Sequence, residues 1–383
     1  MSKLTRSTLI RYIVLAGIAS FVIIFLIMQF TTGFDFGKAI QSIVSAKWWW
    51  ILVALGVNLL SFVFETLQLV FLGLALGKKP RFWRMMQIYF VGNFFSNATP
   101  STSGGEPFQV FFLLDDSYTI AEGTVMVMIR GLISVMVRIL FVVGIVIATF
   151  FGFQLTLSKT LDIIFYITLS GFGLIVIGGI AVLLNPFIFT FFVRFLSRFR
   201  WVRKLAKTED PDDFVAKGTS FLNEIRGSAK LMLSRNKIFI VLAIFNSMLT
   251  WMLLKSMPFF VMLALSESPS ILGVFAIGVV SQLATAWVPT PGAVGGIEIG
   301  MNAFAALMTE PSKNIGIFVL IYRLMDYHMD VFIGAPVALS LLTQKFGAKA
   351  KTTDFSTIGS TIETQMELEK HRQGETKQEQ KSQ

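Results

Sequence analysis

The chain has 383 residues, of which 54% are hydrophobic and 15% are charged, and its mean hydropathy is +0.70. This apolar surface exceeds what a soluble core of this length can bury, so the composition indicates an α-helical membrane protein. With no cysteine and two histidines we expect neither a metal nor another cofactor, and the net charge of +10 lies in loops beside apolar runs, where it orients helices and contacts lipid rather than nucleic acid.

Apolar runs of about 20 residues are long enough to cross the hydrocarbon region as helices. The first run follows a basic start and is too long for a cleaved signal peptide, so we expect it to stay as a span. Six full spans are predicted, at 9–30, 48–76, 121–151, 161–184, 237–265 and 314–342. Two further apolar stretches, 83–114 and 271–309, are broken in the middle by proline and glycine.

Lysines and arginines gather in the loops after the second and fourth spans, which places both loops in the cytoplasm. The spans then alternate correctly only if each broken stretch enters and leaves the membrane on one side. We therefore predict two re-entrant hairpins, the first opening to the cytoplasm and the second to the outside. The protein is expected in the cytoplasmic membrane, with both termini on the cytoplasmic side.

This topology divides the chain into four parts. A first membrane half (1–197) is followed by a cytoplasmic linker with an amphipathic surface helix (198–236) and a second membrane half (237–344). The remainder, 345–383, is rich in Gln, Glu, Lys and Thr and is predicted to be disordered.

The two broken stretches resemble each other. Each spells Thr-Pro, three residues and Gly-Gly, with a glutamate directly after or one residue later. An ionisable residue lies in the span before each stretch (Glu65 and Lys255), and an arginine lies in the span after it (Arg130 and Arg323). Because the predicted orientations of the halves are opposite, the sequence predicts an inverted repeat with a substrate site between the hairpins.

The candidate substrate-binding residues come from both hairpins and the arginines that follow them. They are Thr99, Pro100, Gly104, Gly105, Glu106, Gln109, Arg130, Thr290, Pro291, Gly295, Gly296, Glu298 and Arg323, with Glu65, Lys255 and Asp326 as accessory charges. No catalytic residue is predicted, because no nucleophile or metal ligand accompanies the carboxylates as a hydrolase would need.

Several of these residues have two interpretations. Arg130 and Arg323 either hold a lipid phosphate or pair with Glu106 and Glu298 as structural clamps. The two glutamates either cap the returning half-helices, or one of them faces the cationic part of a headgroup or carries a proton during transport. The Gly-Gly pairs either cradle a phosphate with their backbone amides or permit close helix packing.

Three flanking residues also carry expectations. Lys255 is expected to reach toward a membrane interface, and Glu65 to pair with an arginine of the other half. His328 is expected to be an interfacial polar residue.

The sequence resembles the membrane region of the lysylphosphatidylglycerol synthase and flippase family, the multiple peptide resistance factors. The resemblance covers about residues 9–342, and its most specific parts are Gly92-Asn-Phe-Phe, Gly104-Gly105-Glu106-Pro107-Phe108-Gln109, Pro289-Thr290-Pro291-Gly292 and Tyr322-Arg323-Leu324. It implies a flippase that moves aminoacylated phosphatidylglycerol outward, with resistance to cationic peptides as the result.

The sequence departs from that family pattern in three respects. Glu106 stands where many relatives have glutamine, and Asp326, His328 and Asp330 follow the last arginine. No soluble aminoacyl-transferase domain follows residue 342 in this sequence, so synthase activity is not expected from it.

The leading hypothesis is therefore a lipid flippase of the cytoplasmic membrane. Its expected partners are membrane phospholipids and a separate lipid-modifying transferase, and a homodimer is compatible with the sequence. The alternatives are a membrane component or enzyme of phospholipid modification and a small-solute transporter or channel, although the site lacks the rings of repeated polar residues typical of channels.

Overall fold

The computed structural model describes residues 4–5, 36–99, 104–152, 210–285, 293, 296–346 and 352–353, with short stretches between 170 and 199. The fold is helical, apart from a two-residue pairing of β1 (Leu4–Thr5) with β2 (Thr352–Thr353). The expected span 9–30 lies outside the described residues, as do most of 161–184 and of the tail after 346.

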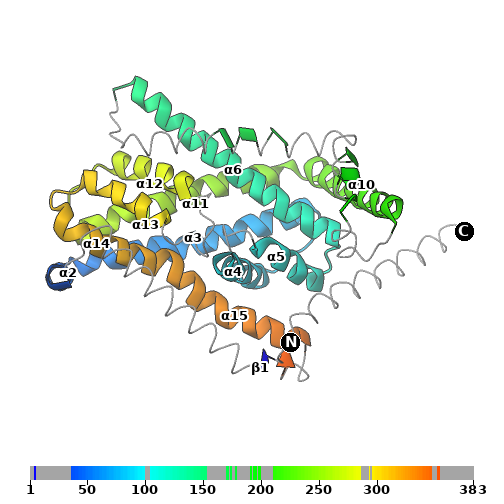
Figure 1. The fold of residues 1–383 in the computed structure, drawn as a ribbon, viewed down its shortest axis with the longest axis horizontal. Coiled ribbons are helices and arrows are strands. Elements are labelled where there is room, and N and C mark those ends of the chain that lie inside the picture. Colours follow the sequence, from blue (N-terminus) through cyan, green and yellow to red (C-terminus); the bar gives the residue numbers. More distant parts are fainter. Residues whose placement is uncertain are drawn as a thin grey trace, which may run out of the picture.

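Two long antiparallel helices form the centre of the molecule. These are α3 (Trp48–Ala75) and α11 (Lys237–Ala264), which pack along most of their length (Figure 1). The amide of Lys47 donates to the carbonyl of Ala264 at 2.8 Å, and Asn246 donates to the carbonyl of Phe64. Polar side chains lie buried between them, so the centre of the pair is not a purely apolar seam.

Three described helices are long and apolar enough to cross a membrane: α3, α11 and the apolar part of α6 (Ile120–Phe150). They lie where the spans 48–76, 237–265 and 121–151 were predicted, which confirms the all-α membrane class. Leu140, Val143, Ile147 and other large apolar side chains on α6 are exposed, as expected for a surface that faces lipid.

The first broken stretch forms a helical hairpin of α4 (Phe82–Ala98) and α5 (Gly105–Leu113), which pack against each other. Gly105 makes the close crossing possible, because a Cβ atom there would lie 2.1 Å from the carbonyl oxygen of Gly92. The helix starts again after the break with the amide of Gly104 donating to the Thr99 hydroxyl at 2.8 Å.

The second broken stretch has the same order of elements. α12 (Ile271–Thr285) packs against α13 (Gly296–Met301), which continues into a 3-10 turn (Asn302–Leu307). Ser281 donates to the carbonyl of Gly300 at 2.8 Å, and a Cβ atom on Gly300 would lie 3.0 Å from that of Ser281. Both hairpins therefore use a glycine where the two half-helices touch.

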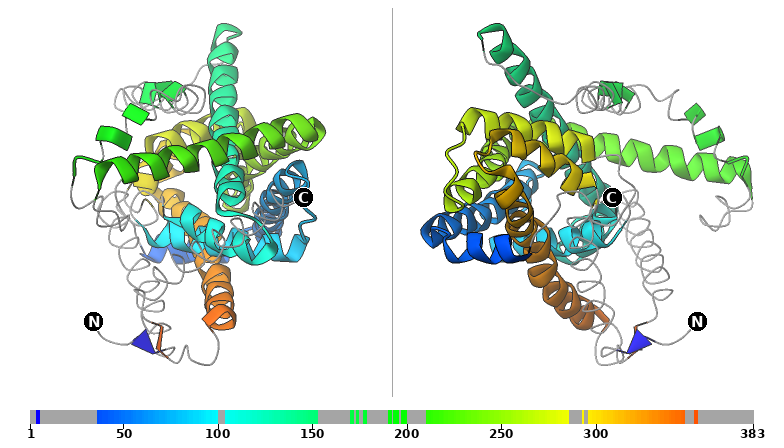
Figure 2. Two further views of the ribbon diagram at one scale, coloured as in Figure 1. Left: turned by 90° about the vertical axis from the view of Figure 1, so that its right-hand side faces the viewer. Right: turned by 60° about the vertical axis from the view of Figure 1, so that its left-hand side comes forward.

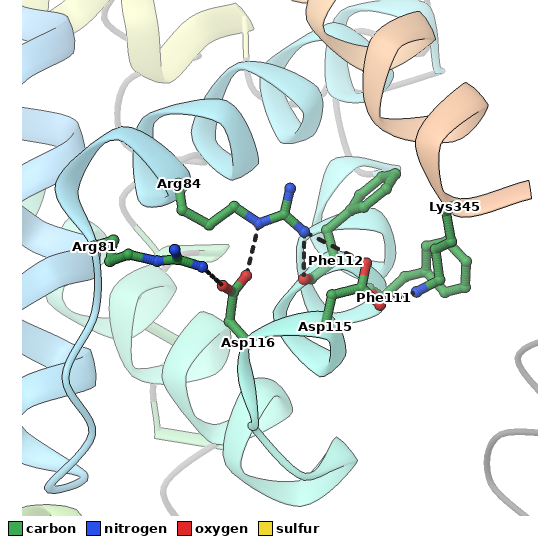
Figure 3. A network of polar contacts seen from close by, with 7 residues as sticks. All are labelled: Arg81, Arg84, Phe111, Phe112, Asp115, Asp116 and Lys345. Carbon is green, nitrogen blue, oxygen red and sulfur yellow. Dashed lines mark hydrogen bonds and ion pairs between the residues drawn. The ribbon is translucent and has the colours of Figure 1, made fainter. Parts of the chain in front are cut away.

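The open end, or mouth, of the first hairpin is tied by an ion-pair cluster. Arg84 at the start of α4 contacts Asp115 and Asp116, which follow α5 in a 3-10 turn (Leu114–Asp116), and Lys345 contacts Asp115 at 2.8 Å (Figure 3). Nearby, Lys78 pairs with Glu122 at 2.8 Å, so this mouth lies where α3 ends.

The mouth of the second hairpin is tied at the opposite end of α3. Glu267, in the loop after α11, accepts hydrogen bonds from the amide of Thr309 at 2.6 Å and from Asn314 at 2.7 Å. Asn314 in turn accepts a hydrogen bond from Ser42 of α2 (Phe36–Val44), the helix that precedes α3. In Figure 1, α12 and α13 accordingly lie toward the left end of the molecule, and α4 and α5 lie farther right, nearer its middle.

The expected span 314–342 is a helix with an irregular centre. α14 (Pro311–Arg323) passes through a π-helical turn (Leu324–His328) into α15 (Met329–Phe346). α15 packs on α4, where a Cβ atom on Gly334 would lie 2.7 Å from the carbonyl oxygen of Phe90. The π-helical turn changes which face of the helix points inward beyond Arg323.

The polar stretch between the halves holds α10 (Pro211–Arg235). Asp210 caps it by accepting from the amide of Asp212, and Pro211 occupies the first turn. Leu222, Ile225 and Met232 are its buried residues, and Figure 2 shows α10 crossing α6.

Candidate functional site

A polar cavity of about 510 Å³ lies between the two hairpins. Its lining includes Asn58 to Gln68 of α3, Val127 to Arg138 of α6 and Trp251 to Lys255 of α11. These segments lie near the middle of three helices that are long enough to cross a membrane, so the cavity is at about half their depth. Gln109 and Glu106 reach it from the first hairpin, and Ala293 and Ile297 from the second.

Among the described residues, the cavity wall carries four acidic and four basic side chains. The acidic ones are Glu65, Glu106, Asp326 and Asp330, and the basic ones are Arg130, Arg138, Lys255 and Arg323. A charge at the centre of a membrane helix costs about 2.5–3.5 kcal/mol on insertion scales, so such residues are usually paired and functional. The wall is therefore unlike an apolar core.

Arg130 of α6 is bound by two residues of the first half. Its guanidinium donates to Glu65 of α3 and to Gln109 of α5, the latter at 3.3 Å, and lies 5.5 Å from the ring centroid of Tyr89. Glu65 was expected to pair with an arginine of the other half, and this is wrong. The clamp interpretation named Glu106 as the partner of Arg130, whereas the direct partner is Glu65.

Arg323 lies at the end of α14 and is 1% exposed. Its guanidinium carbon is 5.0 Å from the ring centroid of Tyr327, and its carbonyl oxygen is 3.0 Å from Nδ1 of His328. His328 is 3% exposed, so its expected interfacial position is wrong. The imidazole instead occupies the π-helical turn, where the carbonyl it contacts lies five residues back.

Lys255 does not extend to an interface as expected. It is 5% exposed, its ammonium group donates to the amide oxygen of Gln282 at 2.9 Å, and it lies 5.0 Å from the ring centroid of Trp251. Trp251 also stacks with Arg138, whose guanidinium carbon is 5.1 Å from the same centroid. The expectation is wrong because the side chain of Lys255 points from α11 toward α12 and into the cavity.

Asp326, in the π-helical turn, and Asp330, at the start of α15, are acidic residues of the cavity wall. Asn93 of α4 donates to Asp330 at 3.1 Å, and Asn58 of α3 donates to the carbonyl oxygen of Met325 at 2.8 Å. The side chains of Asn93 and Asn58 therefore attach the irregular helix α14–α15 to both α4 and α3.

The predicted residues of the first hairpin have distinct positions. Glu106 and Gln109 line the cavity, with Glu106 in the first turn of α5, where a carboxylate is favoured by the helix dipole. Thr99 accepts the hydrogen bond from Gly104, and Gly105 packs on Gly92. The close contacts favour the packing interpretation of this Gly-Gly pair. A phosphate cradle at these glycines stays a prediction.

The predicted residues of the second hairpin are less fully described. Pro100, Thr290, Pro291 and Gly295 lie outside the described residues. Gly296 and Glu298 fall in α13, a helix of six residues, and the adjacent Ile297 lines the cavity. Their binding roles stay predictions.

Several cavity residues were not among the predicted site residues. Trp251, Gln282 and Tyr89 belong to apolar runs in the sequence and carry no motif, and Asn93 lies in the Gly92-Asn-Phe-Phe motif but was not chosen as a site residue. One signal was available, because Trp251 and Lys255 are four residues apart and therefore share a helix face.

Outside the spans, the Glu267 clamp has an electrostatic consequence. Glu267 is 3% exposed, and burial by itself would raise the pKa of its carboxyl group. Hydrogen bonds from Thr309, Asn314 and the amide of Glu310 favour the ionised form and outweigh burial, so the pKa of Glu267 lies below its ordinary value. The ionised carboxylate also faces the N-terminus of α14, where the helix dipole favours it.

The fold and cavity define an α-helical membrane protein with a charged internal site at half depth. The chain belongs to the family described as "Lysylphosphatidylglycerol synthase TM region", whose profile matches residues 13–334. It is also 24% identical over 306 residues to a "UPF0104 membrane protein" of Archaeoglobus fulgidus, a match that covers 79% of this chain and 89% of the relative.

Proposed function

We propose that this protein is a lipid translocase of the cytoplasmic membrane. It moves an anionic or aminoacylated phospholipid of the phosphatidylglycerol type between leaflets, with the headgroup passing through the central cavity. The observation that carries the proposal is a cavity whose described lining includes four acidic and four basic side chains, at half the depth of three apolar helices. A membrane family connected with a phospholipid supports the choice of substrate.

The positions of the hairpins support an alternating mechanism. Their mouths are tied at opposite ends of α3, through Lys78 in one case and Ser42 in the other. We infer an inverted repeat, in which the first hairpin opens to the cytoplasm and the second to the outside. Rocking of the halves then exposes the cavity to each side in turn.

The size of the cavity suits a headgroup and not a whole lipid. A volume of about 510 Å³ lies within the range of about 300–1,000 Å³ common for ligand sites. The acyl chains stay in the bilayer during transport. Arg130 and Arg323 supply guanidinium groups that match phosphate oxygens, and Arg130 exchanges Glu65 for the phosphate during the cycle.

In the cell, the proposed translocase would expose a modified lipid on the outer leaflet. Both termini lie in the cytoplasm, a separate transferase supplies the modified lipid, and its exposure on the outer leaflet reduces binding of cationic peptides. The family is named for a synthase, which favours a second candidate, a membrane component or enzyme of phospholipid modification. Lipid extracts separate the two, because an enzyme changes total lipid composition and a translocase changes only its distribution between leaflets.

The direct test uses proteoliposomes that contain fluorescent phosphatidylglycerol, with dithionite added outside. Wild-type protein is expected to make the inner-leaflet label accessible, and the Arg130→Ala, Arg323→Ala variant is expected to slow this at least tenfold. Lys230→Met, on α10, is the control that leaves the rate unchanged. Equal rates in wild-type and protein-free vesicles would contradict the proposal.

A further inference from the structure

Trp251 is the meeting point of two cations from different parts of the chain. Arg138 comes from α6, and Lys255 lies one helical turn after Trp251 on α11. Their charged groups lie 5.1 and 5.0 Å from the centroid of the same ring, and all three residues line the cavity. Arg130, also on α6, has different contacts, because it is bound by Glu65 and Gln109.

The contacts of Lys255 leave its charge available to a ligand. Its hydrogen bond goes to Gln282, whose amide is neutral, so that contact does not cancel the charge. Arg138 repels Lys255, and Asp326 attracts it electrostatically. Glu65 attracts Arg138 in the same way. Two cations near one ring in a poorly solvated site attract a further anion, because each repels the other.

The first half has a different arrangement at the matching position. There the ionisable residue of the central helix is Glu65, and it neutralises the arginine of α6. In the second half the matching residue is Lys255, which adds positive charge to the wall. The central helix of the second half therefore contributes a positive charge where that of the first half contributes a negative one.

We propose that Lys255, Arg138 and Trp251 form the anion subsite of the cavity and bind the phosphate diester of a lipid headgroup. The choice of a lipid as the source of the phosphate rests on the proposed function. The ammonium and guanidinium groups bind the phosphate oxygens, and the indole ring packs against the adjoining glycerol carbons. In the conformation of this structure the phosphate occupies this subsite while Arg130 is paired with Glu65, and Arg130 takes up the phosphate later in the transport cycle.

Binding is measured in detergent through tryptophan fluorescence, with dihexanoyl phosphatidylglycerol as the probe. The chain has seven tryptophans, so Trp251→Phe identifies the part of the signal that comes from this ring. Lys255→Met is expected to weaken binding at least about tenfold, as loss of a charged hydrogen-bonding group does. Lys255→Arg is expected to stay within about threefold of wild type, and Lys217→Met, an exposed lysine of α10, to bind as wild type.

Several results would overturn the subsite. These are wild-type affinity in Lys255→Met, no binding by the wild-type protein, or a ligand signal that persists in Trp251→Phe. Displacement by inorganic phosphate at equal concentration would show a free-phosphate site instead of a lipid site. Because Lys255→Met replaces a buried charge with an apolar chain of similar length, it is expected to fold, and Arg138→Gln gives an independent variant with the same expected loss.

The transport assay separates this inference from the proposed function. Lys255-dependent binding without lipid movement would retain the subsite and remove the translocase. Lipid movement that is equally fast in Lys255→Met would retain the translocase and remove the subsite.

Discussion

The guanidinium of Arg130 on α6 is bound by the carboxylate of Glu65 on α3, at the wall of the central cavity. The two side chains are 17% and 19% exposed, so the pair is shielded from bulk water. The ion pair joins two apolar helices, and each helix supplies the counter-charge for a buried group of the other. Such a pair is best assessed by removing each partner and then both.

Glu65→Gln is expected to lower the free energy of unfolding by about 1–3 kcal/mol, because it leaves the Arg130 charge without its carboxylate. Arg130→Met is expected to have a loss of similar size. The double variant is expected to be more stable than the sum of the single losses implies, since no charge is left unpaired. Thermal unfolding in detergent measures all four proteins, and strictly additive losses would show that the two groups do not interact.

The crossing of α4 and α5 predicts a steric effect at Gly105. Gly105→Ala places a methyl group against the Gly92 carbonyl oxygen and is expected to destabilise the protein by about 1–3 kcal/mol. Gly144→Ala, in α6, is the control, because no atom lies within 4 Å of its added Cβ, and alanine favours helix. Equal melting temperatures for both variants would contradict the observed crossing.

The hairpins show how far local sequence determines this structure. Thr99-Pro100 and Gly104-Gly105 stop and restart a helix through local backbone chemistry, so the first break was predictable. The partners of Arg130 and Lys255 were not, because they depend on how α3, α6, α11 and α12 rotate against one another. The π-helical turn after Arg323 was also missed, since no residue of Leu324–His328 marks a change from one helix type to another.

The mouth of the second hairpin predicts a pH effect on stability. Because the pKa of Glu267 is lowered in the folded protein, its stabilisation is fully present above the ordinary carboxyl pKa of 4.5 and is lost as pH falls through the lowered value. Glu267→Gln is expected to melt at a lower temperature at neutral pH, with a smaller further loss on acidification below about pH 4.5. Glu224→Gln, exposed on α10, serves as the control. Parallel pH profiles for wild type and Glu267→Gln would exclude the clamp.

The opposed mouths of the hairpins predict labelling from opposite sides of the membrane. The natural sequence has no cysteine, so single cysteines can be introduced without a background. Ser117→Cys, beside the first mouth, is expected to react with a membrane-impermeant maleimide only from the cytoplasmic side, and Ser45→Cys, just before α3, only from the outside. Labelling of both from one side would contradict the inverted arrangement.

The role of the cavity is tested most directly by blocking it reversibly. Gly131 lines the cavity and has no atom within 4 Å of an added Cβ, so Gly131→Cys offers an open position. A bulky methanethiosulfonate reagent is expected to stop lipid movement by Gly131→Cys in proteoliposomes, dithiothreitol to restore it, and the cysteine-free wild type to be insensitive. Lipid movement at an unchanged rate with Gly131→Cys fully modified would contradict passage of the headgroup through this cavity.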